Sequence, residues 1–334
     1  MKAIALISGG LDSTLATKLI QELGIELVCL NTVTPFCQCN HRSAQGCFHG
    51  AQDVAKELGL KLISINVAQE FLPIVKSPKH GYGSHMNPCI DCRILLFKKA
   101  KELMQQEGAS FLVSGEVLGQ RPMSQRLRAM RLIEKEADVE GLVLRPLSAR
   151  VLVPTIMEEQ KWIEREKLLA ISGRGRREQF DLAVHFGIKD YPCPAGGCLL
   201  TDPGFSRRLK DLLDHEEFSL ENILLLKVGR HFRLNRQAKL VVGRNEQENQ
   251  RLSNLSKEGD LVFSPEEEIA GPTCLGRGKF DPGLIKLACG ISSYYCDLNG
   301  AAETGIIFKE FSGQKQRFNS VAPLEKTELE KMRI

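Results

Sequence analysis

Short apolar runs alternate with amphipathic segments through the first half of the chain. Runs rich in aliphatic and β-branched residues predict buried strands, and apolar positions at helical spacing between them predict helices. The predicted strands are Ala3–Ile7, Glu26–Leu30, Lys61–Ile65 and Ser110–Val113, and the predicted helices are Ser13–Glu22, Ala51–Leu58 and Ile90–Gln106. Strands separated by helices are typical of a parallel sheet with helices on both faces, so we expect an α/β fold.

The pattern changes beyond Pro146. Helical spacing predicts helices at Glu158–Leu169, Arg176–Phe186 and Phe205–Leu213. From about Asn222 short apolar runs and turns predict strands at Leu224–Val228, Ala238–Val242, Leu261–Phe263 and Gly305–Phe308. We therefore expect two domains: an α/β domain over residues 1–215 and a small α+β domain over residues 216–334.

Composition narrows the class of protein. Of 334 residues, 43% are apolar and 26% charged, which is ordinary for a globular protein and excludes disordered and collagen-like chains. No apolar run reaches the roughly 18 residues of a membrane-spanning helix. The opening stretch MKAIALISGG is broken by two glycines and then Asp12, which indicates a buried strand entering a loop rather than a signal peptide. We expect a cytoplasmic protein without membrane contact.

Charge and cysteine content point to possible chemistry. The excess of 45 basic over 41 acidic residues gives a net charge of +4, which permits a nucleic-acid partner without requiring one. Eleven cysteines form an odd set in a chain without an export signal, which argues against a disulfide framework. Reduced thiols that cluster are better interpreted as metal ligands or redox nucleophiles.

A glycine-rich hexapeptide, Ser8-Gly9-Gly10-Leu11-Asp12-Ser13, lies directly between a predicted strand and a predicted helix. Glycines permit a sharp turn and close approach of a ligand, and a helix N-terminus attracts phosphate. Ser8 and Ser13 could add hydroxyl donors. Asp12 would repel a phosphate unless Mg²⁺ or a substrate donor lies between them. The alternative is a simple turn in which Asp12 or Ser13 caps the helix.

In this strand–turn–helix context the hexapeptide resembles the pyrophosphate-binding loop of the PP-loop ATP pyrophosphatases, which split ATP into AMP and pyrophosphate and adenylate a substrate oxygen. The resemblance covers about residues 1–215. It implies ATP and Mg²⁺ as cofactors, a catalytic role for Asp12, and nucleotide binding by Ser8, Gly9, Gly10, Leu11, Asp12, Ser13 and Gly115. The loop lacks the Gly-Lys-Ser/Thr of kinase-type P-loops, so transfer of the γ-phosphate is not expected.

The cysteines fall into three groups. Cys89 and Cys92 form a Cys-x-x-Cys at the start of a predicted helix, where both thiols can face one ion and the helix dipole favours thiolates. Cys193 and Cys198 lie in a loop rich in glycine and proline. The third group, after the second predicted strand, consists of Cys37, Cys39 and Cys47, with His41 and His49 nearby.

Three chemistries fit such thiols. Three thiolates suggest an iron–sulfur cluster with one iron free for sulfide, four suggest structural zinc, and a dithiol suggests redox sulfur transfer. The group of Cys37, Cys39 and Cys47 could form a separate zinc site or a substrate loop. Single cysteines such as Cys29 and Cys289 are interpreted as small buried hydrophobes.

The segments NPCIDCR, SGEVLGQRPMSQ, VLRPLSA and YPCPAGGCLLTDP resemble the tRNA thiolation branch of the PP-loop enzymes. That branch includes 2-thiouridylases, 4-thiouridine synthetases and a sub-family with an appended RNA-binding module. Resemblance to its cluster-dependent members implies that Cys89, Cys92 and Cys198 are catalytic and hold a 4Fe–4S cluster, with Cys193 as the alternative third ligand. In cluster-free members a cysteine pair carries a persulfide, which Cys198 could form with Cys89 or Cys92.

Basic stretches are candidates for RNA binding. Residues 120–131 carry four arginines and no acid, and residues 161–177 carry six bases against two acids. Such stretches neutralise phosphates, although they can also be solvated helix faces. The C-terminal segments KVGRHFR and VVGRNEQEN resemble the NFACT-type RNA-binding module over about residues 220–310; the alternative is a domain used for packing. The candidate RNA contacts are Arg121, Arg126, Arg128, Arg174, Arg176, Arg177, Arg230, His231, Arg233 and Arg244.

The motifs together predict an ATP-dependent tRNA uridine thiolase, with tRNA and a sulfur donor, either sulfide or a sulfur-carrier protein, as partners. The carbonyl oxygen of the uracil would be adenylated, and sulfur at C2 or C4 would then displace AMP. Two alternatives stay open: a PP-loop amidase or ligase acting on a small molecule, and a non-catalytic RNA-binding protein that keeps nucleotide and zinc for structure.

Overall fold

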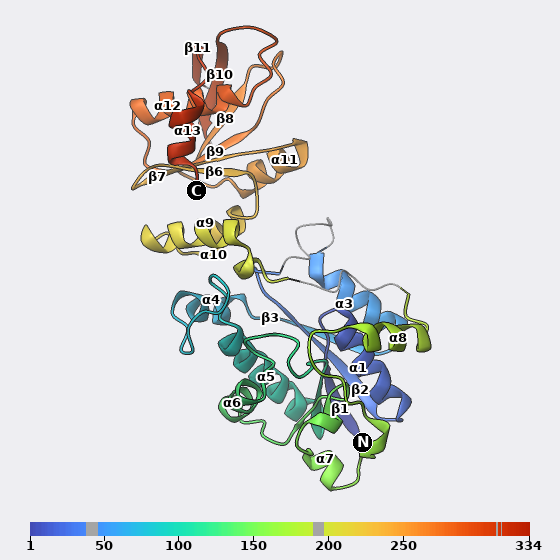
Figure 1. Cartoon of the computed structure of the whole chain (residues 1–334). Helices are drawn as coiled ribbons and strands as arrows, with labels where there is room; N and C mark the ends of the chain where they lie inside the picture. The colour runs from blue at the N-terminus through green and yellow to red at the C-terminus, as the bar shows by residue number, and fades with distance from the viewer. Residues whose placement is uncertain (38–45, 190–196, 312, 315) are drawn as a thin grey trace. The chain divides into compact units, whose positions relative to one another are not determined.

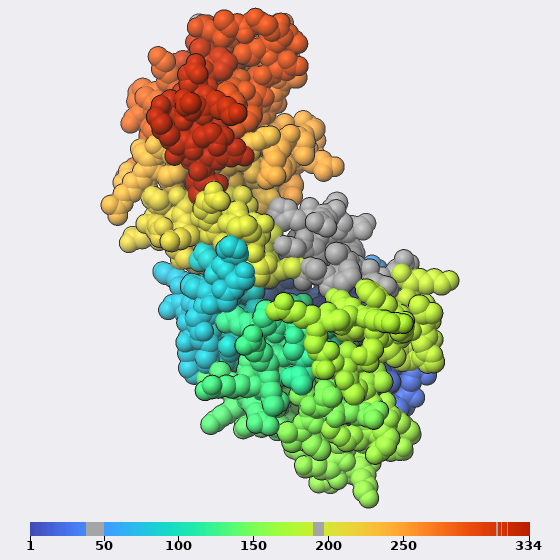
Figure 2. Space-filling view, in the orientation of Figure 1, coloured from blue at the N-terminus to red at the C-terminus, as the bar shows by residue number. Residues whose placement is uncertain are grey.

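The computed structural model describes residues 1–37, 46–189, 197–311, 313–314 and 316–334 (Figure 1, with a space-filling view in Figure 2). Cys39, His41 and Cys193 lie outside the described residues, and the side chains of Cys47 and His49 are not described. The chain divides into two compact units, Met1–Asp202 and Pro203–Ile334.

The first unit is built on a five-stranded sheet in which every neighbouring pair is parallel. Its order is β3-β2-β1-β4-β5. The strands are β1 (Lys2–Leu6), β2 (Glu26–Val33), β3 (Lys61–Asn66), β4 (Phe111–Ser114) and β5 (Val143–Leu144). The chain winds outward from β1 to β3 and then returns to the other side of β1, so the order reverses between β1 and β4. In such sheets ligands bind outside the carboxyl ends of the strands at this reversal.

Helices cover both faces of this sheet, which confirms the predicted α/β fold (Figure 1). Because side chains alternate along a strand, Ala3 and Ala5 of β1 face one layer and Ile4 and Leu6 face the other. The first layer contains α1 (Leu11–Glu22), α3 (Gly46–Glu57) and α8 (Arg177–His185). The second contains α5 (Cys89–Gln106) and α6 (Leu127–Ala137), and α4 (Ala68–Lys76) packs against α5.

The second unit contains a six-stranded antiparallel sheet of order β11-β10-β8-β9-β7-β6. Its strands are β6 (Arg230–Asn235), β7 (Ala238–Val242), β8 (Leu261–Pro265), β9 (Cys274–Gly278), β10 (Thr304–Glu310) and β11 (Gln316–Val321). Helices α12 (Pro282–Tyr294) and α13 (Lys326–Met332) pack on one face, and α10 (Leu220–Leu225) and α11 (Glu246–Leu255) pack on the other. Side chains on β7 alternate accordingly, with Leu240 and Val242 facing α12 and Val241 facing α10.

Two predicted elements are wrong. The helix expected at Glu158–Leu169 is replaced by the single turn α7 (Ile156–Glu159) and a short 3-10 helix at Arg165–Lys167, because the backbone at Lys161 turns left-handed with φ 56°. The strand expected at Leu224–Val228 is instead the end of the helix α10 and the turn that follows it. The first turn of α10 is capped by the Ser219 hydroxyl, which accepts from the amide of Asn222.

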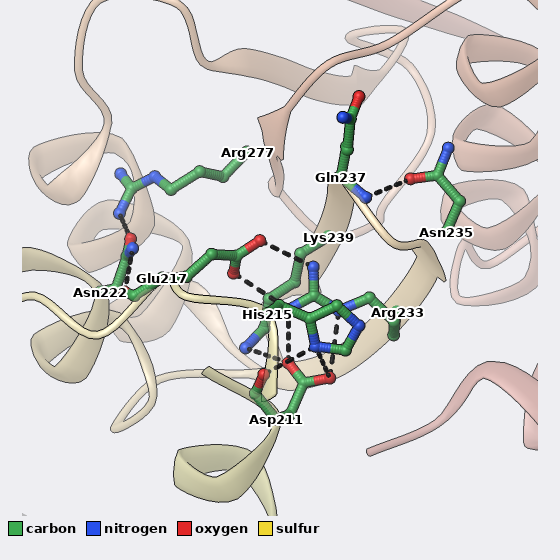
Figure 3. Close-up of polar contacts among 9 residues, drawn as sticks. All are labelled: Asp211, His215, Glu217, Asn222, Arg233, Asn235, Gln237, Lys239 and Arg277. Carbon is green, nitrogen blue, oxygen red and sulfur yellow. Dashed lines mark hydrogen bonds and ion pairs between the residues drawn. The ribbon is translucent and has the colours of Figure 1, made fainter. Parts of the chain in front are cut away.

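The division between the units falls after Asp202, whereas the sequence predicted it after residue 215. The difference is α9 (Pro203–Asp214), which is held in the second unit by a charge cluster shown in Figure 3. Arg233 Nε donates to Asp211 Oδ1 at 3.1 Å, and Arg233 Nη1 donates to Glu217 Oε1 at 2.9 Å. The ammonium of Lys239 lies 3.5 Å from Asp211 Oδ2, and burial lowers the pKa of Lys239 to about 8.

Arg233→Ala should destabilise the second unit, because it leaves the nearly buried Asp211 with a weaker partner. We expect a loss of about 2–3 kcal/mol in the free energy of unfolding, measured by urea titration. Arg236→Ala is the matched control, since Arg236 is exposed in the neighbouring turn of the same hairpin. Equal stability of the two variants would contradict this role for the cluster.

Candidate functional site

The glycine-rich hexapeptide forms the loop between β1 and α1, at the carboxyl end of β1. Gly9 has a left-handed backbone with φ +74°, and a Cβ there would lie 2.8 Å from the carbonyl carbon of Gly50 in α3. Gly10 is the N-cap residue of α1, with extended backbone and no side-chain cap. The alternative in which Asp12 or Ser13 caps the helix is therefore wrong, and the first turn of α1 is suited to an anion.

The serines of the loop hold its shape. Ser13 Oγ donates to the carbonyl of Gly10 at 2.8 Å and accepts from the amide of Ser8 at 3.2 Å. The two serine hydroxyls lie 3.2 Å apart. Ser13 therefore uses its single hydroxyl proton inside the loop, and the two serines brace the loop internally.

Gly115 follows β4 and lies directly against this loop. A Cβ on Gly115 would lie 2.5 Å from the amide nitrogen of Ser13 and 2.6 Å from the carbonyl oxygen of Asp12, closer than real Cβ atoms approach backbone. Only glycine fits this position without displacing the start of α1. The ends of β1 and β4 therefore meet, as the sheet order requires.

Asp12 is engaged by two residues from far along the chain. Arg176 Nη2 lies 2.9 Å from Asp12 Oδ1, and Gln120 Nε2 donates to Asp12 Oδ2 at 2.7 Å. Gln179 of α8 in turn donates to Gln120 at 3.3 Å. This arrangement offsets the negative charge of Asp12 beside the anion site. Arg176, predicted as an RNA contact, lies against Asp12 of this loop.

Four thiols gather near the same sheet edge. Cys89 is the first residue of α5 and Cys92 lies one turn later, while Cys198 precedes a short 3-10 helix and pairs with Cys37 in an isolated antiparallel bridge. Burial, with smaller contributions from the thiols of Cys89 and Cys37, raises the pKa of Cys92 to about 12, although Arg93 acts in the opposite direction. Burial also raises the pKa of Cys198, with added contributions from Cys92, Cys37 and Cys89.

The sequence did not place Cys37 with this set. It predicted either a separate zinc site with Cys39 and Cys47 or a substrate loop, and neither partner is described here. Nothing in the sequence around Cys37 predicts that it lies beside Cys198, because the two residues are far apart in the sequence and meet only in the folded chain. Cys198 is also within electrostatic reach of Cys89 and Cys92.

Among the described residues, no three His, Cys, Asp or Glu side chains converge closely enough to bind a single metal ion. Thiolates are nevertheless the ligands that iron–sulfur clusters require. The donor set of Cys89, Cys92 and Cys198 therefore fits a cluster in its chemistry.

Arginines lie between the thiols and the glycine-rich loop Ser8–Ser13. Arg93, next to Cys92, lies 3.4 Å from the buried carboxylate of Glu116, which also accepts from Arg145 Nε at 3.0 Å. Desolvation by the surrounding protein lowers the pKa of Arg121, although its side chain is exposed, and Arg93 lowers it further. Cys89, Asp12 and Glu116 act in the opposite direction on Arg121. One guanidinium is thus within electrostatic reach of both the thiols and the loop.

The start of α5 is fixed by a histidine that the sequence analysis missed. His80 Nδ1 lies 2.9 Å from Asp91 Oδ1, and His80 Nε2 lies 3.1 Å from Glu136 Oε1 of α6. The backbone amide of His80 also donates to Asp91 Oδ2 at 3.0 Å. Asp91 lies between the two cysteines of the Cys-x-x-Cys, so this contact orients the turn that carries them.

The candidate RNA contacts divide by exposure. Exposed side chains on the first unit are those of Arg121, Arg126, Arg128, Arg174 and Arg177. In the second unit, Arg244 is 46% exposed and donates through Nη2 to the carbonyl of Gly229 at 2.8 Å. The Arg230 guanidinium lies 4.7 Å from the centre of the Tyr295 ring.

Two predicted RNA contacts are corrected. His231 is only 1% exposed, its Nε2 lies 2.8 Å from the carbonyl oxygen of Val228, and burial lowers its pKa well below 6.5. Arg233 is engaged by Asp211 and Glu217. Both side chains therefore stabilise the second unit rather than presenting a surface to RNA.

Comparison with known families confirms both resemblances. Residues 1–157 match the model described as thiamine biosynthesis protein (ThiI), and residues 229–333 match the model described as NFACT protein RNA binding domain. Two separate parts of the chain, neither of which reaches half of its length, are therefore similar to these two families.

Curated relatives match part of the first unit. A probable tRNA sulfurtransferase of Ureaplasma parvum is 32% identical over 151 residues, covering 44% of this chain and 37% of that protein. A tRNA-specific 2-thiouridylase MnmA of Pelobacter propionicus is 28% identical over 121 residues, covering 34% of this chain and 33% of that protein. The chain thus spans little more than a third of the length of these relatives.

Solved structures with some similarity include a 4-thiouridine synthetase–RNA complex with bound ATP, at 20% identity and a TM-score of 0.36, covering 67% of this chain and 53% of that one. The U34-tRNA thiolase NcsA of Methanococcus maripaludis with its [4Fe-4S] cluster gives 20% identity and a TM-score of 0.35, covering 67% and 70%. Within the part of the chain that the structure describes, no helix has the length and apolar character to cross a membrane.

Gly115→Ala should weaken ATP binding, because the added methyl group displaces the backbone of Asp12 and Ser13. We expect at least about a tenfold loss of affinity, which corresponds to about 1.4 kcal/mol. Isothermal titration with ATP measures it. Gly175→Ala is the control, since a Cβ at Gly175 meets no atom within 4 Å. Unchanged affinity in Gly115→Ala would remove Gly115 from the site.

Stability of the metal-free protein should fall as the pH rises above about 9. Folded Cys92 keeps its proton to about pH 12, whereas the thiol ordinarily titrates near 9.0, so the unfolded state binds fewer protons in this window. Comparing wild type with Cys92→Ala by urea unfolding isolates this thiol. The wild type should lose about 1 kcal/mol more than the variant between about pH 9 and pH 10. Parallel pH profiles would contradict the raised pKa.

Proposed function

We propose that this chain is an ATP-dependent tRNA thiolase that adenylates a uridine carbonyl oxygen and then replaces AMP with sulfur. The observation that carries the proposal is that the glycine-rich loop Ser8–Ser13 (the nucleotide loop) and the cluster of thiols lie at one sheet edge. Both are within electrostatic reach of Arg121. The ThiI match over residues 1–157 and relatives named tRNA sulfurtransferase and 2-thiouridylase support this activity. The NFACT RNA-binding match over residues 229–333 supports an RNA substrate.

ATP would bind with its phosphates at Ser8–Ser13. The amides of the first turn of α1 and the dipole of that helix would hold the pyrophosphate as charge develops on it. Asp12 would orient Mg²⁺ or the nucleotide, with Arg176 and Gln120 fixing its carboxylate at 2.9 and 2.7 Å. Arg121 and Arg93 would offset the negative charge of the α-phosphate as the carbonyl oxygen attacks.

Adenylation makes the exchange of oxygen for sulfur feasible. A carbonyl oxygen is a very poor leaving group, whereas a phosphate ester of that oxygen departs as AMP. This step lowers the barrier for attack by sulfur on the same carbon. AMP and pyrophosphate are therefore the expected products, rather than ADP.

Cys89, Cys92 and Cys198 would hold a 4Fe–4S cluster, with Cys193, outside the described residues, as the alternative third ligand. When bound with three protein thiolates, such a cluster supplies an iron that is open to exogenous sulfide. The raised pKa values of Cys92 and Cys198 mean that iron must displace thiol protons, so cluster assembly should be favoured by higher pH. His80 and Asp91 position the turn that carries Cys89 and Cys92.

The RNA would be held mainly through its phosphates. The exposed arginines of the first unit and Arg244 of the second are suited to this role, and Arg230 adds a planar group beside Tyr295. A sulfur donor, either sulfide or a sulfur-carrier protein, completes the reaction.

Asp12→Ala and Cys92→Ala should separate the two halves of the reaction. Protein is purified anaerobically, iron and acid-labile sulfide are measured, and thiolated tRNA is resolved on a mercury-affinity gel. Wild type should contain about four irons and four sulfides per chain. Asp12→Ala should keep this content but lose ATP-dependent thiolation, and Cys92→Ala should lose both.

Cys296→Ser, in the second unit, is the matched thiol control and should behave as wild type. Thiolation by Asp12→Ala would contradict the role of the nucleotide loop. Wild-type iron in Cys92→Ala would remove Cys92 from the ligand set. If active wild type contained zinc or no metal, the proposed sulfur carrier would be a cysteine persulfide rather than a cluster.

A further inference from the structure

Cys37 and Cys198 face each other across a short antiparallel pairing. The amide of Leu199 donates to the carbonyl of Phe36 at 2.8 Å, and this bond joins the residues that flank the two cysteines. That pattern makes Cys37 and Cys198 a non-hydrogen-bonded pair. In such pairs the Cα atoms lie about 4.5 Å apart and the side chains approach most closely.

This geometry is suited to a disulfide. Disulfides join cysteines whose Cα atoms are about 4.4–6.8 Å apart, and the separation in a non-hydrogen-bonded pair falls inside that range. Both cysteines are free thiols with partly exposed side chains, so an oxidant can reach them. Cys37 also contacts the hydroxyl of Thr34, with 3.6 Å between Sγ and Oγ1. No large backbone movement is needed to join the two sulfurs.

We propose that Cys37 and Cys198 form a reversible disulfide, which withdraws Cys198 from the group of thiols around Cys89 and Cys92. The disulfide itself follows from the pairing of the two residues. Its consequence rests on the proposed function, because Cys198 is the third thiolate of the proposed cluster and the partner in the persulfide alternative. Oxidation at this pair and loading of the site with iron would then exclude each other.

The reaction needs an external disulfide as oxidant. One of the two thiolates attacks a sulfur of that disulfide, which releases one thiol and leaves a mixed disulfide on the protein. The second thiolate then attacks the protein sulfur of the mixed disulfide, forms the Cys37–Cys198 bond and releases the second thiol. The two cysteines lose two protons and two electrons, and the oxidant gains both. A dithiol reductant reverses the sequence.

The first experiment maps the disulfide in the full-length chain. Metal-free protein is incubated with oxidised glutathione, free thiols are blocked with N-ethylmaleimide, and peptides are analysed by mass spectrometry without reduction. The main cross-linked peptide pair should contain Cys37 and Cys198, and it should disappear after treatment with dithiothreitol. A dominant Cys89–Cys92 or Cys92–Cys198 disulfide would overturn the proposal.

The second experiment measures iron uptake after the same oxidation. Wild type should take up several-fold less iron and sulfide than untreated protein, whereas Cys37→Ser should resist this loss. Cys296→Ser is the matched control and should lose uptake as wild type does. If oxidation reduced iron uptake equally in wild type and in Cys37→Ser, the Cys37–Cys198 disulfide would not be the cause of that loss, and this part of the proposal would be wrong.

The mapping keeps this inference separate from the proposed function. A mapped Cys37–Cys198 disulfide in a protein that thiolates no RNA supports the pairing and rejects the thiolase. An active thiolase whose oxidised form lacks this disulfide supports the function and rejects the pairing.

Discussion

The close approach of the two loops that follow β1 and β4 is the constraint on which the site depends. Gly115 leaves no space for a Cβ against the backbone of Asp12 and Ser13, so the two loops are fixed at van der Waals distance. Because the sheet order reverses between these strands, the helices that follow them, α1 and α6, lie on opposite faces of the sheet. The start of α1 and the segment that begins with Glu116 are thereby held together.

Ion pairs rather than apolar contacts link this junction to the neighbouring elements of the site. The carboxylate of Glu116 is 2% exposed and pairs with Arg93 on α5 and with Arg145 after β5. Removing a carboxylate and two guanidiniums from water is unfavourable unless each has a partner, so the three groups specify one another's positions. The result is that α5, which carries Cys89 and Cys92, is tied to the same edge as the nucleotide loop.

Local patterns in the sequence predicted the parts of this site that local structure determines. The strand, loop and helix around residues 8–13 were predicted because their apolar spacing and glycines are contiguous, and Cys89 and Cys92 were placed at a helix start for the same reason. The contact between Asp12 and Arg176 joins residues 164 positions apart, and the Cys37–Cys198 bridge joins two loops. Neither has a periodic signal. His231 was wrongly predicted to contact RNA, because a motif specifies residue types but not which side chains are buried under helices.

The thiols and the nucleotide loop impose opposite electrostatic requirements on one small region. Thiolates beside a triphosphate would repel it, yet metal ligation and sulfur transfer both require thiolates. Burial meets both demands. It raises the pKa values of Cys89, Cys92 and Cys198, so these thiols stay neutral until they bind a metal or react with an oxidant. Arg93 and Arg121 counter the effect of that burial on the pKa values of Cys89 and Cys92, and Asp12 in turn raises the pKa of Arg121. In the proposed reaction, the same cations would favour phosphate binding in one step and thiolate formation in another.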